Sequence, residues 1–544
     1  MKWRLIILSL CFISIYSVLG NANDNNRISP DGLIPSTVNF YIKTSIIKKS
    51  IKSTAFFIQN FIFKKDSHRI HQWVNWFKKQ TDCDTLDPKS LSKVGIDINQ
   101  SLYIAYENPI NKSEKLIIFI PVKNEKNFSL NFIKMLKKIN KDKTDFDLNP
   151  ITTWYKDYKT NQILKDIFFT TIDGYFILTS SSKYMRQIID IKKDREGDSL
   201  LESPLYCDYM KQNNSPCDLN LFIKKEFFIN SYINTLKLEK NRIDINIVLS
   251  EMEDSYFDLI KYIGCGLKIE SGTIDFKVLA SINLDCLSAK LLMKIFIPGK
   301  LEKSIFVDNP AAYHYLSLNI DTLDMLYNKL EKSSIQKKSN FNILKQFENF
   351  CNIDLKEDFI PYFDGFFNIS IRKPEIQSDM DNFIFFFSMK DTSRNNNLWE
   401  KIRVAVKNRY KNNNKFGEEK IDNIDSFWFN NYRGDKISFF ANENDFYISN
   451  NIEFLRVTQN YNDKNIFDLD HEYIKKIDPQ TFLISYIRFD TDSFMKNFLL
   501  VMAFKIKPQL YNIIKTSDDL FLIGKKIDKY FTFDCRMKIS PVIE

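Results

Sequence analysis

The chain has 544 residues, of which 44% are hydrophobic, and it includes 48 Phe and 25 Tyr. This length predicts about two to four domains, and this composition supplies packed interiors and excludes a disordered chain. The formal net charge is +9, but the Lys residues are scattered among Asp and Glu and form no Arg-rich basic block, which argues against nucleic-acid binding.

The N-terminus has the pattern of a secretory signal peptide. Lys2 and Arg4 give a short cationic start, an apolar run without charge follows from Leu5 to Leu19, and small residues stand at Gly20 and Ala22. This arrangement predicts cleavage after Ala22, so that residues 1–22 are removed and the remainder is exported to the periplasm or the extracellular space. The alternative is an uncleaved N-terminal anchor. No later segment reaches membrane-spanning length without a charge, so we expect no transmembrane segment after cleavage.

Two helices are expected in the first hundred residues. Ile70, Trp73, Val74 and Phe77 recur at the i, i+3, i+4, i+7 spacing of an apolar helix face. The segment from Thr44 to Phe63 is also predicted as a helix, with little polar face near its C-terminal end. Such a helix is either buried on two sides or offers an apolar surface to another molecule, and burial in an interdomain contact is the commoner use and is expected here.

Strand-like runs come in adjacent pairs joined by short turn sequences. Asp173-Gly174, Ser271-Gly272 and the stretch from Asn442 to Asn444 are signals of this kind. Because such turns join antiparallel neighbours, they predict hairpins and a largely antiparallel sheet. With helices packed on the sheet, the fold class expected is α+β.

The two halves of the chain contain similar landmarks in the same order, at an offset of about 257 to 275 residues. We therefore predict two similar tandem units, residues 23–297 and 298–544, with the seam near residues 297–302. Each unit is expected to contain a largely antiparallel sheet covered by helices. The paired landmarks are Pro35 and Pro310, Gly95-Ile96-Asp97 and Asn352-Ile353-Asp354, Trp154–Tyr158 and Trp428–Tyr432, Gly174–Ile177 and Asp445–Ile448, and Tyr262–Gly264 and Leu522–Gly524.

The sequence contains only 13 Gly and four His, and it lacks a phosphate-binding loop, a nucleophile elbow and a zinc-binding helix motif. His68 and His71 have a spacing that could place two imidazoles on one metal, but the apolar stripe puts them near the solvated side of their helix. His314 lies in an apolar strand and His471 begins a polar helix, with no motif around either. We therefore expect no catalytic, cofactor-binding or metal-binding residues.

Seven cysteines remain after the predicted cleavage, and their odd number leaves at least one thiol without a partner in the same chain. Cys207 and Cys217 flank a short loop and are the best placed for a local disulfide. No pair has the C-x-x-C spacing of a zinc or thioredoxin-like site. Most of these thiols are expected to be small buried hydrophobic side chains.

At the paired landmarks the chain resembles a family of exported bacterial proteins of unknown function. In that family, duplicated α+β units each begin with a proline-led strand and later contain a Gly-Ile-Asp step. The second half has Asn352 where the family favours Gly. The resemblance covers most of the chain after the signal peptide, and it implies the architecture and export but no catalytic residues.

Three classes of function follow from these observations. The first is a non-enzymatic envelope protein that binds another protein or a surface component through its sheets or an interdomain groove. The second is a carrier for a lipid or another apolar ligand, suggested by the apolar segment from Thr44 to Phe63. The third and least favoured is an envelope hydrolase with His314 or His471 as its base.

Overall fold

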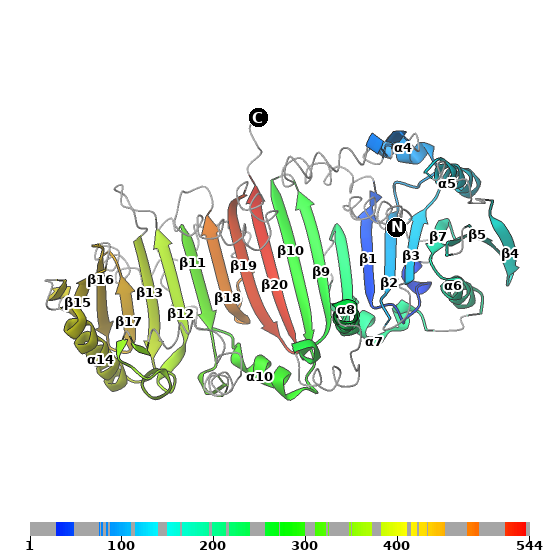
Figure 1. Cartoon of the computed structure of the whole chain (residues 1–544). Coiled ribbons are helices and arrows are strands. Elements are labelled where there is room, and N and C mark those ends of the chain that lie inside the picture. The colour runs from blue at the N-terminus through cyan, green and yellow to red at the C-terminus, as the bar shows by residue number, and fades with distance from the viewer. Residues whose placement is uncertain are drawn as a thin grey trace. The chain divides into compact units, whose positions relative to one another are not determined.

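The computed structural model contains two compact units: one ends at Cys286 and the other runs from Leu287 to Ser540 (Figure 1). The predicted signal peptide, and the stripe of Ile70, Trp73, Val74 and Phe77, lie outside the residues that the structure describes. Those residues are 29–47, 75–76, 78–79, 83–84, 87–109, 115–139, 149–163, 166–194, 198–213, 217–239, 256–270, 272–299, 311–322, 325, 348–349, 351–372, 382–410, 415–421, 424–431, 434–451, 476–488 and 517–539.

The strands of the first unit pair in the order β10–β9–β8–β1–β2–β3–β7–β6–β5–β4, and every pairing is antiparallel. The β4 strand has β5 as its single neighbour among the described residues, so it is an edge of this sheet. The strands are β1 (Phe40–Ile46), β2 (Ser101–Glu107), β3 (Lys115–Pro121), β4 (Ile151–Tyr155), β5 (Tyr158–Gln162), β6 (Phe168–Ile172), β7 (Tyr175–Thr179), β8 (Leu219–Lys224), β9 (Ile260–Glu270) and β10 (Thr273–Ile282).

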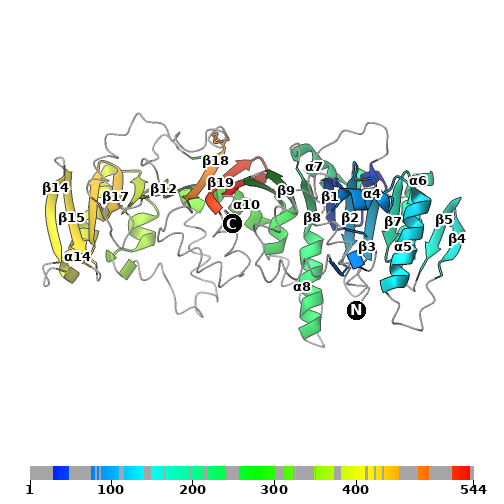
Figure 2. The same cartoon turned by 90° about the horizontal axis from the view of Figure 1, so that it is seen from above.

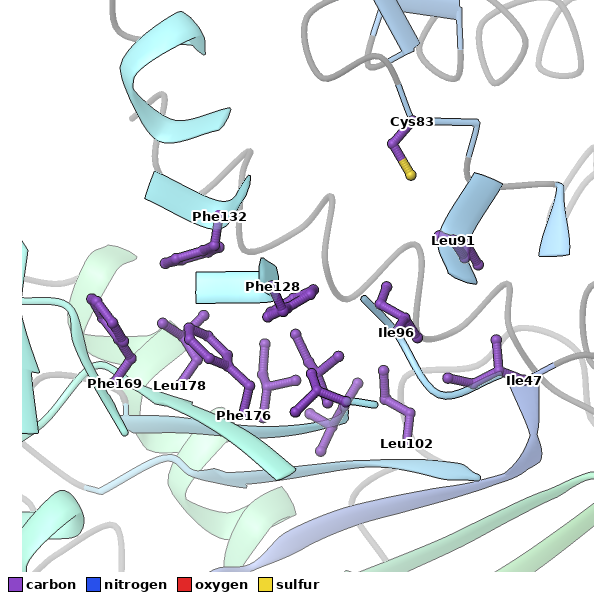
Figure 3. Packing of buried hydrophobic residues seen from close by; sticks show 14 of the residues in the cluster. Ile47, Cys83, Leu91, Ile96, Leu102, Phe128, Phe132, Phe169, Phe176 and Leu178 are labelled. Carbon is purple, nitrogen blue, oxygen red and sulfur yellow. The ribbon is translucent and has the colours of Figure 1, made fainter. Parts of the chain in front are cut away.

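One face of this sheet packs against helix α5 (Glu125–Ile139), which follows the short helix α4 (Pro88–Lys93) in the chain. Phe128 and Phe132 of α5 point into the core, where their rings lie 4.9 and 5.1 Å from the ring of Phe176 on β7 (Figure 3). Phe169 of β6 and Leu178 of β7 complete this part of the core. Helix α8 (Lys225–Glu239) covers the same face further along, over β8 and β9 (Figure 2).

The opposite face is rich in tyrosine and is covered by α6 (Ser182–Asp194) and α7 (Pro204–Gln212) (Figure 2). Tyr41 of β1 meets Tyr206 of α7 edge to face, with 5.4 Å between the ring centroids. Tyr103 of β2 and Tyr175 of β7 form another such pair at 5.9 Å. Because successive strand residues point to opposite faces, a strand buried on both sides can supply Ile to one face and Tyr to the other.

The strands of the second unit pair in the order β20–β19–β18–β11–β12–β13–β17–β16–β15–β14, again antiparallel throughout. Both units therefore combine antiparallel sheet with helices, and the α+β class is confirmed. The strands are β11 (Ala312–Ser317), β12 (Phe363–Arg372), β13 (Asn382–Met389), β14 (Phe416–Ile421), β15 (Ile424–Asn430), β16 (Lys436–Asn442), β17 (Asp445–Ser449), β18 (Thr481–Arg488), β19 (Ser517–Ile527) and β20 (Tyr530–Ile539).

The second sheet also has a helix-covered face and a tyrosine-rich face. Leu398, Ile402 and Val406 of α14 (Thr392–Tyr410) belong to a core with Phe427 of β15 and Phe446 of β17. The other face contains a separate cluster of aromatic and aliphatic side chains from β11, β12, β13, β18 and β19. Its buried members are Tyr313, Tyr315, Phe366, Phe386, Ile484, Tyr486, Phe521 and Ile523.

The predicted helix from Thr44 to Phe63 is wrong at its start. Thr44 to Ile46 complete strand β1, and residues 48–63 lie outside the described residues. The reason is a contact between strands: the Thr44 hydroxyl accepts a hydrogen bond from the Leu102 backbone N–H at 2.9 Å and donates one to the Ser45 carbonyl at 2.8 Å. This pairing with β2 overrides a helical pattern that the local sequence alone suggests.

Candidate interaction surface

His314 is the one sequence-predicted catalytic candidate within the described residues, because His68, His71 and His471 lie outside them. It lies on β11, and its Nδ1 atom is 2.8 Å from Oγ of Ser485 on β18. This pair could not be predicted from the sequence, because 171 positions separate the two residues. A serine beside an imidazole is the beginning of a nucleophile and base arrangement.

The surroundings of this pair do not support hydrolysis. Burial lowers the pKa of His314, and no described hydrogen-bond partner reaches its Nε2 atom. The backbone of β11 pairs on both sides, with β12 and β18, so its N–H groups are committed to the sheet and cannot stabilise an oxyanion. We interpret Ser485 as the hydrogen-bond partner that lets a neutral imidazole occupy a sheet interior.

Cys207 and Cys217 are both free thiols, so the local disulfide expected between them is not present. The Cys207 thiol donates to the Leu201 carbonyl at 2.8 Å. Burial raises the pKa of Cys83 and Cys265 to about 11. A raised pKa keeps these side chains as thiols at neutral pH and makes them poor nucleophiles.

Within the described ranges, no group of His, Cys, Asp or Glu side chains is arranged to hold a metal ion. In the same part of the chain, no helix combines the length and apolarity needed to cross a membrane.

Asp31 is one of the most enclosed carboxylates among the described residues of the first unit, with 3% exposure. It accepts hydrogen bonds from the hydroxyls of Tyr41 and Ser29, and Lys43 Nζ lies 3.5 Å from it. Charged groups of this kind persist in an interior only when they are paired and hydrogen bonded. The carboxylate of Asp31 is paired in this way, and its contacts join the segment before β1 to the tyrosine-rich face.

The edge strand β4 is the most unusual surface of the described chain. Ile151 is 64% exposed and Trp154 is 71% exposed, and the strand from Ile151 to Tyr155 contains no charged residue. Natural proteins usually protect an edge strand with charges, proline or a covering element, because its unpaired N–H and C=O groups can bind another strand. In Figure 1, β4 lies at the outer end of its sheet, beyond β5.

The β4–β5 hairpin is fixed to the body of the unit through α6. The Tyr155 hydroxyl donates to Asp190 at 2.9 Å, and Lys156 forms an ion pair with the same carboxylate at 2.7 Å. Lys193 pairs with Asp157 of the hairpin turn at 2.9 Å. Lys156 and Asp157 have φ values of 44° and 69°, as a two-residue hairpin turn requires. The edge is therefore presented in a defined orientation.

The edge strand of the second unit, β14, is protected where β4 is not. Glu418 of β14 pairs with Arg403 at 2.7 Å and with Lys407 at 3.2 Å, both on α14. Trp428 of β15 lies across from Gly417, and a Cβ atom at Gly417 would come within 2.4 Å of its ring. Charge and a covering aromatic ring thus close this edge.

No family model and no curated protein matches the chain. Among solved structures, the chain is similar to TP0453 in crystal forms IV, I and III, with 10, 10 and 11% sequence identity and a TM-score of 0.25 in each case. These similarities cover 47, 48 and 49% of this chain and 81, 81 and 86% of TP0453.

Proposed function

We propose that this chain is an exported, non-enzymatic envelope protein that binds another protein by accepting an extended segment along β4. The observation that carries the proposal is the uncharged edge strand with Ile151 and Trp154 exposed on it. Backbone groups along such an edge supply affinity by hydrogen bonding to an added strand, and the outward side chains supply specificity.

The contacts of the hairpin with α6 favour binding further. Asp190 and Asp157 hold Tyr155, Lys156 and Lys193 in place, so the edge is ordered before a partner arrives. An edge that is already ordered loses little conformational entropy on binding, and more of the interaction energy appears as affinity.

A duplicated origin of the two units supports a functional role for the difference between their edges. The two strand orders correspond one to one, from β1 with β11 to β10 with β20, and this correspondence is why we propose that the units are copies. The edge strands β4 and β14 are then equivalent positions. Because β14 is closed by Glu418 and Trp428, an open edge is not a requirement of the fold.

Export is part of the proposal and rests on the N-terminal pattern up to Ala22. The lipid-carrier hypothesis has no further support, because residues 48–63 of the segment that suggested it lie outside the described residues.

The test is selection of binders from a displayed library of random ten-residue peptides on the full mature protein. Alternate residues of an edge strand point their N–H away from the neighbouring strand. Thr152 and Thr153 are neighbours, so only one of them points its N–H away from β5. In the pair Thr152→Pro and Thr153→Pro, the variant at that position removes only an outward N–H and leaves the pairing with β5 intact. We call it the informative β4 proline. We expect this variant to keep the stability of the unmodified protein and to lose at least about tenfold in peptide affinity, which is about 1.4 kcal/mol.

The matched control is Lys420→Ala on the protected edge β14, where the side chain is 71% exposed. This variant should bind the selected peptides as the unmodified protein does. Selected peptides that bind both β4 proline variants with unchanged affinity would show that β4 is not the binding edge.

A further inference from the structure

The two sides of the β4–β5 hairpin differ in charge. On the side of α6, the cations that border the hairpin are engaged: Lys156 and Lys193 form ion pairs with carboxylates, and the Arg186 guanidinium lies 5.5 Å from the centroid of the Tyr155 ring. The two lysine charges are therefore compensated by carboxylates within the unit, and Arg186 lies over an aromatic ring.

The other side of the hairpin faces the same way as α5. Phe169 belongs to the core beneath α5 and pairs with Asn161 of β5, so Asn161 and its alternate neighbour Lys159 lie on that side. Trp154 is directly opposite Lys159 in the register of β4 and β5. The exposed indole ring and the exposed ammonium group are thus neighbours on one surface.

Lys159 forms no ion pair with any carboxylate among the described residues, and neither does Lys137 of α5. Lys137 instead donates to the neutral side chain of Asn149, just before β4, at 3.1 Å. One exposed carboxylate, Asp166, follows β5 in the chain on the connection to β6. The α5 side of the edge therefore presents an apolar ring together with cations that no described acid compensates.

We infer that the segment bound along β4 is acidic, with carboxylate side chains at the positions that point to the same side as Trp154 and Lys159. This inference rests on the proposed function and specifies the chemistry of the partner. It follows from charge complementarity, because the rim of a strand-addition site selects partners of opposite charge.

The geometry of an added strand permits this contact. Neighbouring strands lie about 4.8 Å apart, so a residue opposite Trp154 on an added strand would be about 10 Å from the backbone of Lys159. A glutamate and a lysine side chain reaching over the indole ring together span that distance. Aspartate is shorter and would make the contact less well, so glutamate is the preferred residue.

The experiment uses three labelled ten-residue probes in which valine alternates with glutamate, glutamine or lysine, and measures their binding to the full mature protein by fluorescence anisotropy. We expect affinity in the order glutamate, glutamine, lysine. Lys159→Gln should weaken the glutamate probe about three- to fivefold, as for one exposed ion pair, and leave the glutamine probe unchanged. The glutamate probe should also weaken as salt rises from 50 to about 300 mM.

Lys420→Gln is the matched control, because Lys420 is a lysine on the protected edge strand β14 and its side chain is 71% exposed. It should change none of the three affinities. If all three probes bind with equal affinity and the informative β4 proline still weakens their binding, the inference of an acidic partner is overturned. The proposed function then stands. Binding of no probe, or binding insensitive to both prolines, would overturn the proposed function itself.

Two other occupants are distinguished in the same preparation. A dimer seen by sedimentation and lost in Trp154→Ala would show that a second copy fills the edge. A blue shift of tryptophan fluorescence on neutral phosphatidylcholine vesicles, also lost in Trp154→Ala, would show a lipid surface. Either result would overturn the inference of an acidic partner.

Discussion

At the residue scale, Gly95 and Asn352 both have a positive φ. Gly95 has a φ of 104° and Asn352 a φ of 51°, and each precedes a buried isoleucine, Ile96 or Ile353. Positive φ values are easily adopted by Gly and tolerated by Asn, whose short polar side chain suits the left-handed region. The Asn at this landmark is therefore compatible with the turn that Gly makes in the first unit.

This shared turn predicts different costs for different substitutions. We expect Gly95→Ala to lower the free energy of unfolding by about 1–2 kcal/mol, because alanine strains the backbone there. Its Cβ atom would also lie 3.2 Å from the Asn124 carbonyl oxygen and from Phe128. Asn352→Gly should change stability by only about 0.5 kcal/mol. Urea unfolding measures both, and a Gly95→Ala protein as stable as the unmodified one would contradict the strain.

His314 predicts a pH dependence of stability. Burial lowers its pKa below the ordinary 6.5, so the unfolded chain gains a proton first as the pH falls. The unfolded state then binds more protons than the folded state, and the free energy of unfolding decreases below about pH 6.5. His314→Leu should make the decline between pH 7.5 and 5.5 less steep in urea unfolding. Ser485→Ala keeps the half-buried imidazole and should keep the decline. Equal slopes for His314→Leu and the unmodified protein would refute this assignment.

At the element scale, hairpins were predictable because turn chemistry is local. Asp173 and Gly174 do join β6 to β7 with φ values of 50° and 78°, and Gly272 precedes β10 with a φ of 86°. The stretch from Asn442 to Asn444 joins β16 to β17. Each turn needs only its own residues to adopt positive φ or to close a short loop.

The edge strands were not predictable, because pairing order is a property of the whole sheet. Trp154 and Trp428 look alike in sequence, but they lie on β4 and β15, which occupy different places in their sheets. The landmark that pairs Gly174 with Asp445 is also shifted by one residue relative to the structure. Phe176 and Phe446, which this landmark does not align with each other, both belong to the helix-covered cores. A slip of one residue moves a side chain to the other face, which hydrophobic composition alone does not reveal.

The packing of helices on each sheet predicts large local losses of stability. Phe176 and Phe446 are both fully buried, at 0% exposure, in separate cores. Replacing either with Ala should cost about 3–5 kcal/mol in its own unit, because a large cavity remains. Hydrogen exchange should show lost protection in β2, β3 and β7 for Phe176→Ala, and in β12, β13 and β17 for Phe446→Ala. Loss of protection across both units in either variant would contradict separate cores.

At the scale of the whole molecule, the buried cysteines bear on the proposed export to an oxidising compartment. The thiols of Cys83, Cys217 and Cys351 are buried, and their burial raises the pKa of each. Disulfide formation begins with attack by a thiolate, so a raised pKa together with burial slows it. These buried thiols would therefore be oxidised only slowly in the compartment that the proposed export implies.

The proposed export gives the last prediction, because the N-terminal pattern up to Ala22 predicts a cleavable signal peptide. Signal peptidase accepts small residues at the positions of Gly20 and Ala22. We expect the exported protein to begin at Asn23, as measured by intact mass and N-terminal sequencing. Gly20→Phe combined with Ala22→Phe should retain the 22-residue extension and leave the protein attached to the membrane fraction. Asn26→Ala, beyond the cleavage position, should be processed normally, and a cytosolic pool with an intact Met1 would rule out this route.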